Sequence, residues 1–255
     1  RMRMFSVHFI HVWQRNRDVF LRLWRTEAVG YVIEPIIILL GLGMGLGIYI
    51  GVVDGQNYVE FLAPGIMASY SMFSASFECT YGSFIRMEYQ NTYDAILATP
   101  LNVADVIAGE IFWGATRAML TGTGILVIAA IFQLVQSPWA ILIPIVCFLN
   151  GLMFAGIALF FTSLAPAIYT FNYFFTLFIN PIFFLSGVFF PLDQFPPILQ
   201  KLSWLSPLTS VVHITRALFT GKFSADLWLA LALVIAFSVV FFAISLVTMR
   251  RRIIK

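Results

Sequence analysis

Four charged residues lie inside otherwise apolar stretches of the chain: Glu34, Glu78, Glu110 and Arg117. If these stretches cross a membrane, their charges are costly there and usually carry function. A relay that moves protons is one interpretation. The other is that they lie near a membrane surface or pair in salt bridges, and it is favoured because the glutamates fall near predicted helix ends. Glu110 and Arg117 share a helix face, but seven positions are too many for a direct pair.

A segment of mixed polarity, residues 86–101, separates two of the apolar stretches. Pro100 should stop any helix that starts near Glu88. Asn102 followed by Asp105 is typical of the start of the next helix. A short helix held between two membrane helices could transmit force from a soluble partner. An ordinary connecting loop remains the alternative.

Aromatic side chains are abundant, and Phe alone accounts for 27 of the 255 residues. Many lie in the middle of apolar stretches, where their faces could stack against sugar rings. We name four as candidates for lining a conduit: Phe73, Phe77, Phe174 and Phe178. For any single ring, packing and lipid contact is the competing interpretation.

Residues that could bind a metal ion or act as nucleophiles do not form a recognisable motif. The histidines and cysteines concerned are His8, His11, His213, Cys79 and Cys147. Their spacing fits neither a metal site nor a disulfide framework. Gly221-Lys222 lacks the glycine-rich context of a phosphate-binding loop. We therefore expect no catalytic residue, no metal and no cofactor in this chain.

The elements that must position these residues are membrane helices. Hydrophobic residues make up 60% of the chain and charged residues 11%, whereas soluble domains carry roughly a quarter charged residues. The net charge of +3 comes from basic residues that flank the apolar stretches, so nucleic-acid binding is a poor explanation. Such basic flanks mark the cytoplasmic side of a membrane.

Six apolar stretches are long enough to cross a bilayer, which needs about 20 residues in a helix. The predicted spans are 31–51, 60–83, 104–133, 139–163, 168–189 and 226–249. They are continuously apolar rather than alternating, which excludes a β-barrel and predicts helices. The sequence thus predicts an all-α membrane protein with a single transmembrane domain over residues 1–255.

Two further elements are predicted, one before the first span and one between the fifth and sixth spans. Residues 3–26 alternate apolar and basic positions at helical spacing, which predicts an amphipathic helix on the membrane surface; a soluble cap is the alternative. Residues 190–225 contain four prolines and apolar pieces too short to span, which predicts a re-entrant outer hairpin. With both termini cytoplasmic, 11 of the 15 basic residues lie inside, three outside and one, Arg117, within a span.

Several stretches resemble a known family. They are Phe61-Leu-Ala-Pro-Gly-Ile-Met67, Ser76-Phe-Glu78, Arg86-Met87, Tyr93-Asp-Ala-Ile-Leu-Ala-Thr-Pro-Leu101 and Leu185-Ser-Gly-Val-Phe-Phe-Pro191. Together they look like the permeases of ABC exporters of the nodulation-protein-J type. That type belongs to the class that includes O-antigen and teichoic-acid export permeases. The resemblance covers nearly the whole chain and is specific for the permease class, much less so for the cargo.

This resemblance implies a homodimer of six-helix subunits in the bacterial inner membrane, each docked on one of two copies of a separate ABC ATPase that holds ATP and Mg. Segment 86–101 would be the coupling helix region that contacts the ATPase. Its candidate residues are Arg86, Glu88, Tyr93, Asp94, Leu97, Pro100 and Leu101. The conduit would form between subunits, near spans one, two and five, in contact with membrane lipids.

The expected cargo is an amphipathic molecule, glycan-linked or lipid-linked, because members of this class export such molecules. Other branches move drugs or peptides, so these remain alternatives. A proton-coupled secondary transporter that uses Glu78 and Glu110 is a rival of another class. A membrane scaffold that transports nothing is a further rival.

Overall fold

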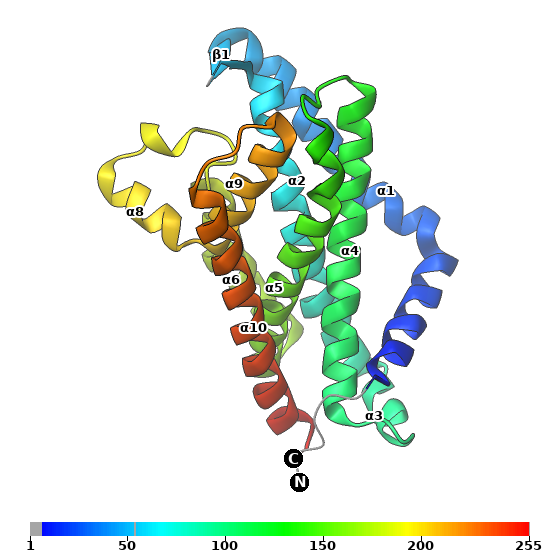
Figure 1. Cartoon of the computed structure of the whole chain (residues 1–255). Helices are drawn as coiled ribbons and strands as arrows, with labels where there is room; N and C mark the ends of the chain where they lie inside the picture. Colours follow the sequence, from blue (N-terminus) through cyan, green and yellow to red (C-terminus); the bar gives the residue numbers. More distant parts are fainter. Residues whose placement is uncertain (1–6, 54, 255) are drawn as a thin grey trace.

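The computed structural model describes residues 7–53 and 55–254, with side chains throughout except at 27–32. The predicted helix 3–26 therefore begins outside the described residues. The chain forms a bundle of long helices (Figure 1). One end of the bundle carries a small hairpin of β1 (Val52–Val53) and β2 (Gln56–Asn57), and we call it the β1 end. The other carries the short helix α3 (Thr92–Leu97), and we call it the α3 end.

The first helix, α1 (Phe9–Ile50), joins the predicted surface helix and the predicted first span into one element. Figure 1 shows it as two legs that meet at an angle, the first beside the long green helix α4 (Val103–Ile131) and the second rising to the β1 end. Pro35 lies inside α1, where its ring cannot donate a backbone hydrogen bond. The two predicted elements are therefore continuous in backbone but differ in direction.

The second helix, α2 (Tyr58–Phe77), is longer than predicted. Two π-helical turns, η1 (Glu78–Gly82) and η2 (Ile85–Tyr89), continue it to Tyr89, so it passes the predicted end at residue 83. Glu88 does not begin a helix but lies inside this extension. Residues 86–89 still belong to this extension, and α3 begins only at Thr92, after Asn91 turns the chain with a positive φ of 48°. As predicted, α3 ends before Pro100.

The start of α4 follows the predicted capping pattern. The Asp105 backbone N–H donates to the Asn102 side-chain oxygen at 3.0 Å, and the Asn102 N–H donates to the Asp105 carboxylate at 3.2 Å. These reciprocal bonds satisfy backbone donors that a helix start leaves without partners. The sequence alone therefore located this helix start.

After α4 comes a continuous helix made of η3 (Pro138–Leu142) and α5 (Ile143–Leu164). A broken helix follows, made of η4 (Ile168–Thr170), α6 (Phe171–Phe174), η5 (Phe175–Ile179) and α7 (Asn180–Leu185). The chain then forms η6 (Leu192–Gln194), the helix pair α8 (Pro197–Leu205) and α9 (Pro207–Thr220), and the last helix α10 (Asp226–Ile253). Helices α8 and α9 occupy the region of the predicted hairpin, and Figure 1 shows α8 projecting from the side of the bundle.

Within the described residues, five helical stretches are long and apolar enough to cross a membrane. They are Ile33–Ile50, Val103–Ile131, Pro138–Leu164, Ile168–Leu185 and Asp226–Ile253. Helix α2 is not among them, although it is the most enclosed: it packs against α1, α4, α5 and α9. A helix surrounded by protein need not be as lipophilic as one that faces lipid, and α2 accordingly contains buried serines such as Ser69, Ser71 and Ser74.

Small residues and buried hydrogen bonds hold the helices together, as is usual where lipid removes the hydrophobic drive for helix association. Gly109 of α4 leaves room for Val12 of α1, because a Cβ at that glycine would collide with the valine. The Asn150 amide of α5 donates to the Ala68 carbonyl at 2.8 Å and to the Ser71 hydroxyl at 2.6 Å. These contacts hold α1 close to α4, and α5 close to α2.

Candidate functional site

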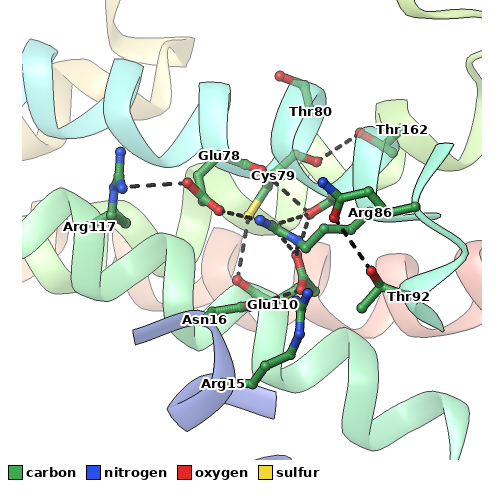
Figure 2. Close-up of polar contacts among 12 residues, drawn as sticks. Arg15, Asn16, Glu78, Cys79, Thr80, Arg86, Thr92, Glu110, Arg117 and Thr162 are labelled. Atoms are coloured by element: carbon green, nitrogen blue, oxygen red, sulfur yellow. Dashed lines mark hydrogen bonds and ion pairs between the residues drawn. The ribbon is translucent and has the colours of Figure 1, made fainter. Parts of the chain in front are cut away.

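A network of buried charges joins α2 and α4 near the α3 end (Figure 2). The Arg86 guanidinium lies 2.8 Å from the Glu78 carboxylate and 2.5 Å from the Glu110 carboxylate. Glu78 also lies 3.9 Å from the Nε of Arg117. Three of the four intramembrane charges predicted from sequence therefore meet in one place, with Arg86 as the cation between the two carboxylates.

The π-helical turns of α2 make this arrangement possible. A π-turn widens the helix and shifts the phase of the residues that follow. Here it places Glu78 and Arg86 on the side that faces α4. Gly82 lies between them, and a side chain there would press against both the Glu78 and Arg86 side chains.

Glu110 is 1% exposed, yet its carboxylate is well satisfied. Besides Arg86, it accepts hydrogen bonds from the Ser83 hydroxyl at 2.6 Å and the Asn16 amide at 2.9 Å. The Asn16 bond brings the first leg of α1 into the network. A buried carboxylate with this many donors is suited to holding three helices together, because buried charged groups need pairing and hydrogen bonds.

Glu34, the fourth predicted charge, lies elsewhere, on the second leg of α1. Its carboxylate accepts a hydrogen bond from the Tyr70 hydroxyl of α2 at 3.3 Å. The two residues belong to the wall of a groove of about 720 Å³ between α1, α2 and α7. Aromatic rings form much of the rest of this wall, and Ser74 and Asn180 add polar groups.

The four conduit candidates divide between this groove and the protein interior. Phe73 and Phe77 line the groove, and Phe73 packs edge-on against Phe183 with ring centroids 5.3 Å apart. Phe174 and Phe178 pack instead on Phe161 of α5, at 4.6 and 5.6 Å. Two of the predicted conduit rings thus pack against α5, a helix that the sequence analysis did not assign to the conduit.

The predicted coupling residues lie at the α3 end. Tyr93 is buried beneath α3, and Asp94 and Pro100 are exposed. Leu97 and Leu101 are half-buried. Burial raises the pKa of the Tyr93 phenol, and the negative charge of Glu110 raises it further. The segment thus presents exposed side chains at the end of the bundle while Tyr93 anchors it.

Arg252, near the end of α10, contacts two other segments at the α3 end. Its guanidinium lies 2.8 Å from the Glu88 carboxylate and donates to the Thr162 and Ala165 carbonyls at 2.5 and 2.6 Å. A hollow of about 870 Å³ lies beside these contacts, lined by Asp94 and Arg252 among others. The end of α2, the end of α5 and the end of α10 therefore share one cation.

At the β1 end, Arg216 of α9 has a comparable position. Its Nη2 donates to the Gly187 carbonyl at 2.9 Å and to the Phe61 carbonyl at 3.4 Å, and its guanidinium lies 4.0 Å from the centre of the Phe61 ring. The outer helix pair is thereby fixed to α2 and to the turn after α7.

Sequence reasoning missed Asn16, Arg216 and Arg252 as structural links. Arg216 gave a signal: it is a basic residue in a predicted outer segment with few charges. Arg252 was interpreted as one of a basic flank, where its neighbours Arg250 and Arg251 are indeed exposed. Within the described residues, no group of three or more His, Cys, Asp or Glu side chains could hold a metal ion.

Comparison with known proteins gives a consistent result over nearly the whole chain. The sequence profile of the ABC-2 type transporter family matches residues 8–220. A nodulation protein J from Rhizobium leguminosarum bv. trifolii is 38% identical over 98% of this chain and 95% of its own length. Another from Rhizobium meliloti (strain 1021) is 37% identical, over 96% and 94%. The inner membrane transport permease YadH of Escherichia coli (strain K12) is 24% identical, over 95% and 94%.

Proposed function

Because the chain belongs to the ABC-2 type transporter family, we propose that it is the membrane subunit of an ATP-driven exporter whose cargo is an amphipathic, glycan- or lipid-linked molecule. Members of this family are transmembrane transport subunits that work with ATPase partner subunits. ATP and Mg then belong to the partner, and this chain supplies the path through the membrane.

The groove between α1, α2 and α7 is the observation that carries the proposal on cargo. It combines the rings of Phe73, Phe77 and Phe183 with the carboxylate of Glu34 and the amide of Asn180. Sugars present apolar ring faces and hydroxyl groups, so a wall of aromatic faces with scattered hydrogen-bonding groups suits them. The polar groups also lower the cost of moving a polar headgroup through an apolar region.

Force would enter through the α3 end. The partner ATPase would contact the exposed side of segment 86–101, including Asp94. Motion of this segment would pass along the extension of α2 to the Arg86–Glu110 pair and so to α4. A second route would pass from Glu88 through Arg252 to α5 and α10. Rigid ion pairs at helix ends are suited to this task because they resist sliding.

The proposed assembly contains two copies of this chain and two ATPase subunits in the bacterial inner membrane. Helix α2 would be the sixth span, with the α3 end and both termini in the cytoplasm. The first leg of α1 would lie at the membrane surface, and α8 with α9 would form the re-entrant outer hairpin. Lipid would contact the second leg of α1, where Ile37 and Ile48 are exposed.

The test is ATP hydrolysis by the purified chain with its copurifying ATPase in lipid nanodiscs. A lipid-linked glycan should stimulate hydrolysis. Phe77→Ala should raise the glycan concentration needed by about three- to tenfold, the worth of one aromatic contact. Phe132→Ala is the control, since Phe132 is exposed to a similar degree but lies outside the groove. Equal effects of the two variants would remove the groove from the proposal.

One observation favours a second candidate function. The Glu34 carboxylate in the groove wall would attract a cationic drug as well as a sugar hydroxyl. Stimulation by cationic amphiphiles but not by glycans, and its loss in Glu34→Gln, would identify a drug exporter instead.

A further inference from the structure

A second cavity, of about 430 Å³, lies between the first leg of α1, the π-helical extension of α2, and α4. Its volume is in the range of small-molecule binding sites. Three guanidinium groups belong to its wall, from Arg15, Arg86 and Arg117. Each comes from a different helix, so the bundle itself brings the three together.

Among the residues that the structure describes, the arginines outnumber the carboxylates around this cavity. Glu78 and Glu110 form ion pairs with Arg86, and Glu78 also approaches Arg117. Arg15 is the third cation and, among the described residues, forms no ion pair: its Nη1 donates to the side-chain oxygen of the neighbouring Asn16 at 3.0 Å. Figure 2 shows Arg15 extending from α1 toward Glu110 and Arg86. Burial lowers the pKa of Arg15 and the positive charge of Arg86 lowers it further, while the negative charge of Glu110 opposes these two effects.

A net positive charge held in a partly buried cavity is unfavourable unless an anion joins it. Guanidinium groups bind phosphate oxygens through paired N–H donors, and arginine is the residue preferred for such contacts. The electrostatics therefore call for an anion of the phosphate type, placed beside Arg15.

The same cavity has an apolar margin. Val19 and Leu23 of α1 are 46% and 51% exposed, and Phe77 of α2 is 40% exposed. Exposed apolar side chains beside partly buried arginines suit a molecule with a charged head and an apolar tail, and a free inorganic ion would leave them uncovered. We propose that this cavity binds the phosphate headgroup of a membrane amphiphile, with Arg15 as its principal contact.

The test uses the purified full-length chain in nanodiscs of phosphatidylcholine, without ATPase or cargo, so its result does not depend on transport. Short-chain phosphatidylglycerol is the probe, and its affinity is measured by microscale thermophoresis. Arg15→Gln should weaken binding about tenfold or more, as expected for the loss of a charged hydrogen bond. Arg22→Gln removes the same charge from an exposed position of the same helix outside the cavity, and should change affinity less than twofold.

A second variant tests the cavity without changing any charge. Val19→Trp fills the margin from a position exposed enough to accept the larger side chain, and it should also weaken phosphatidylglycerol binding. Equal losses in Arg15→Gln and Arg22→Gln would overturn the proposal, because they would indicate general attraction to a basic helix. So would unchanged binding in Arg15→Gln and Val19→Trp. Competition by inorganic phosphate at the same concentration as the lipid would refute the amphiphile as occupant.

Discussion

Arg86 and Glu110 lie 24 positions apart in the sequence, yet the Arg86 Nη2 lies 2.5 Å from the Glu110 Oε2. Arg86 lies in the extension of α2, and Glu110 lies in the first half of α4. The same guanidinium also pairs with Glu78. Arg86 is therefore the cation that the two buried carboxylates share.

Removing this cation should destabilise the subunit strongly. Arg86→Met leaves Glu78 and Glu110 buried without their shared partner, and breaking a buried pair in this way costs about 3–5 kcal/mol. Thermal unfolding in detergent measures the loss. The control is Arg17→Met, whose exposed pair with Asp18 contributes about 0–1 kcal/mol. Adding Glu110→Gln to Arg86→Met should recover part of the stability, and equal unfolding temperatures for the two single variants would contradict the assignment.

Replacing Arg252 should uncouple hydrolysis from transport. Arg252→Gln loses the ion pair with Glu88 and the bonds to the Thr162 and Ala165 carbonyls. We expect less cargo moved per ATP, with a stability loss of about 1–3 kcal/mol from the unsatisfied groups. The measurement is transport and hydrolysis in the same proteoliposomes. Arg250→Gln removes an exposed charge from the same helix end and should leave the ratio of transport to hydrolysis unchanged.

Within the proposed coupling segment, residues 86–101, neighbouring residues should behave differently. Asp94 is exposed, so Asp94→Ala should alter stability by no more than about 0.5 kcal/mol while reducing cargo-stimulated ATP hydrolysis several-fold. Tyr93 is buried, and Tyr93→Ala should cost about 3–5 kcal/mol, as for other large aromatic residues. Asp193→Ala, an exposed acidic residue distant from α3, is the control. Normal coupling in Asp94→Ala would show that the ATPase docks elsewhere.

The outer helix pair should loosen when Arg216 is changed. Arg216→Ala removes the bonds to the Gly187 and Phe61 carbonyls, and Arg216→Lys cannot replace a guanidinium that lies over the Phe61 ring while it donates to both carbonyls. Amide hydrogen exchange over residues 186–206 should accelerate about tenfold or more in both variants. Lys201→Ala, an exposed change in α8, should leave exchange elsewhere in that stretch unaltered. Full protection in Arg216→Lys would mean that charge alone fixes the hairpin.

The proposed orientation in the membrane can be tested by labelling. The two native cysteines, Cys79 and Cys147, are buried and give little background. Thr99 and Lys222 are exposed at opposite ends of the bundle. In intact cells, an impermeant maleimide should label Lys222→Cys and not Thr99→Cys. The reverse pattern would place the α3 end outside and exclude its contact with a cytoplasmic ATPase.

The sequence by itself determined the properties that depend on neighbouring residues. The long apolar stretches predicted helices close to those observed, because length and hydropathy are local quantities. The capping residues Asn102 and Asp105 located the start of α4, and Pro100 limited α3, since both act within one helical turn. The permease family was also evident from short stretches of sequence.

The tertiary structure decided which of these residues meet. Glu78 pairs with Arg86 and Arg117, and Arg252 reaches Glu88 from 164 positions away. Such contacts depend on the phase of each helix, which the π-turns of α2 shift, and on which helices become neighbours. Phe174 likewise packs against Phe161 and does not line the groove. The average hydropathy of a stretch does not tell which side of its helix faces a neighbouring helix. Only packing in three dimensions could therefore assign each side chain to the core, the groove or an ion pair.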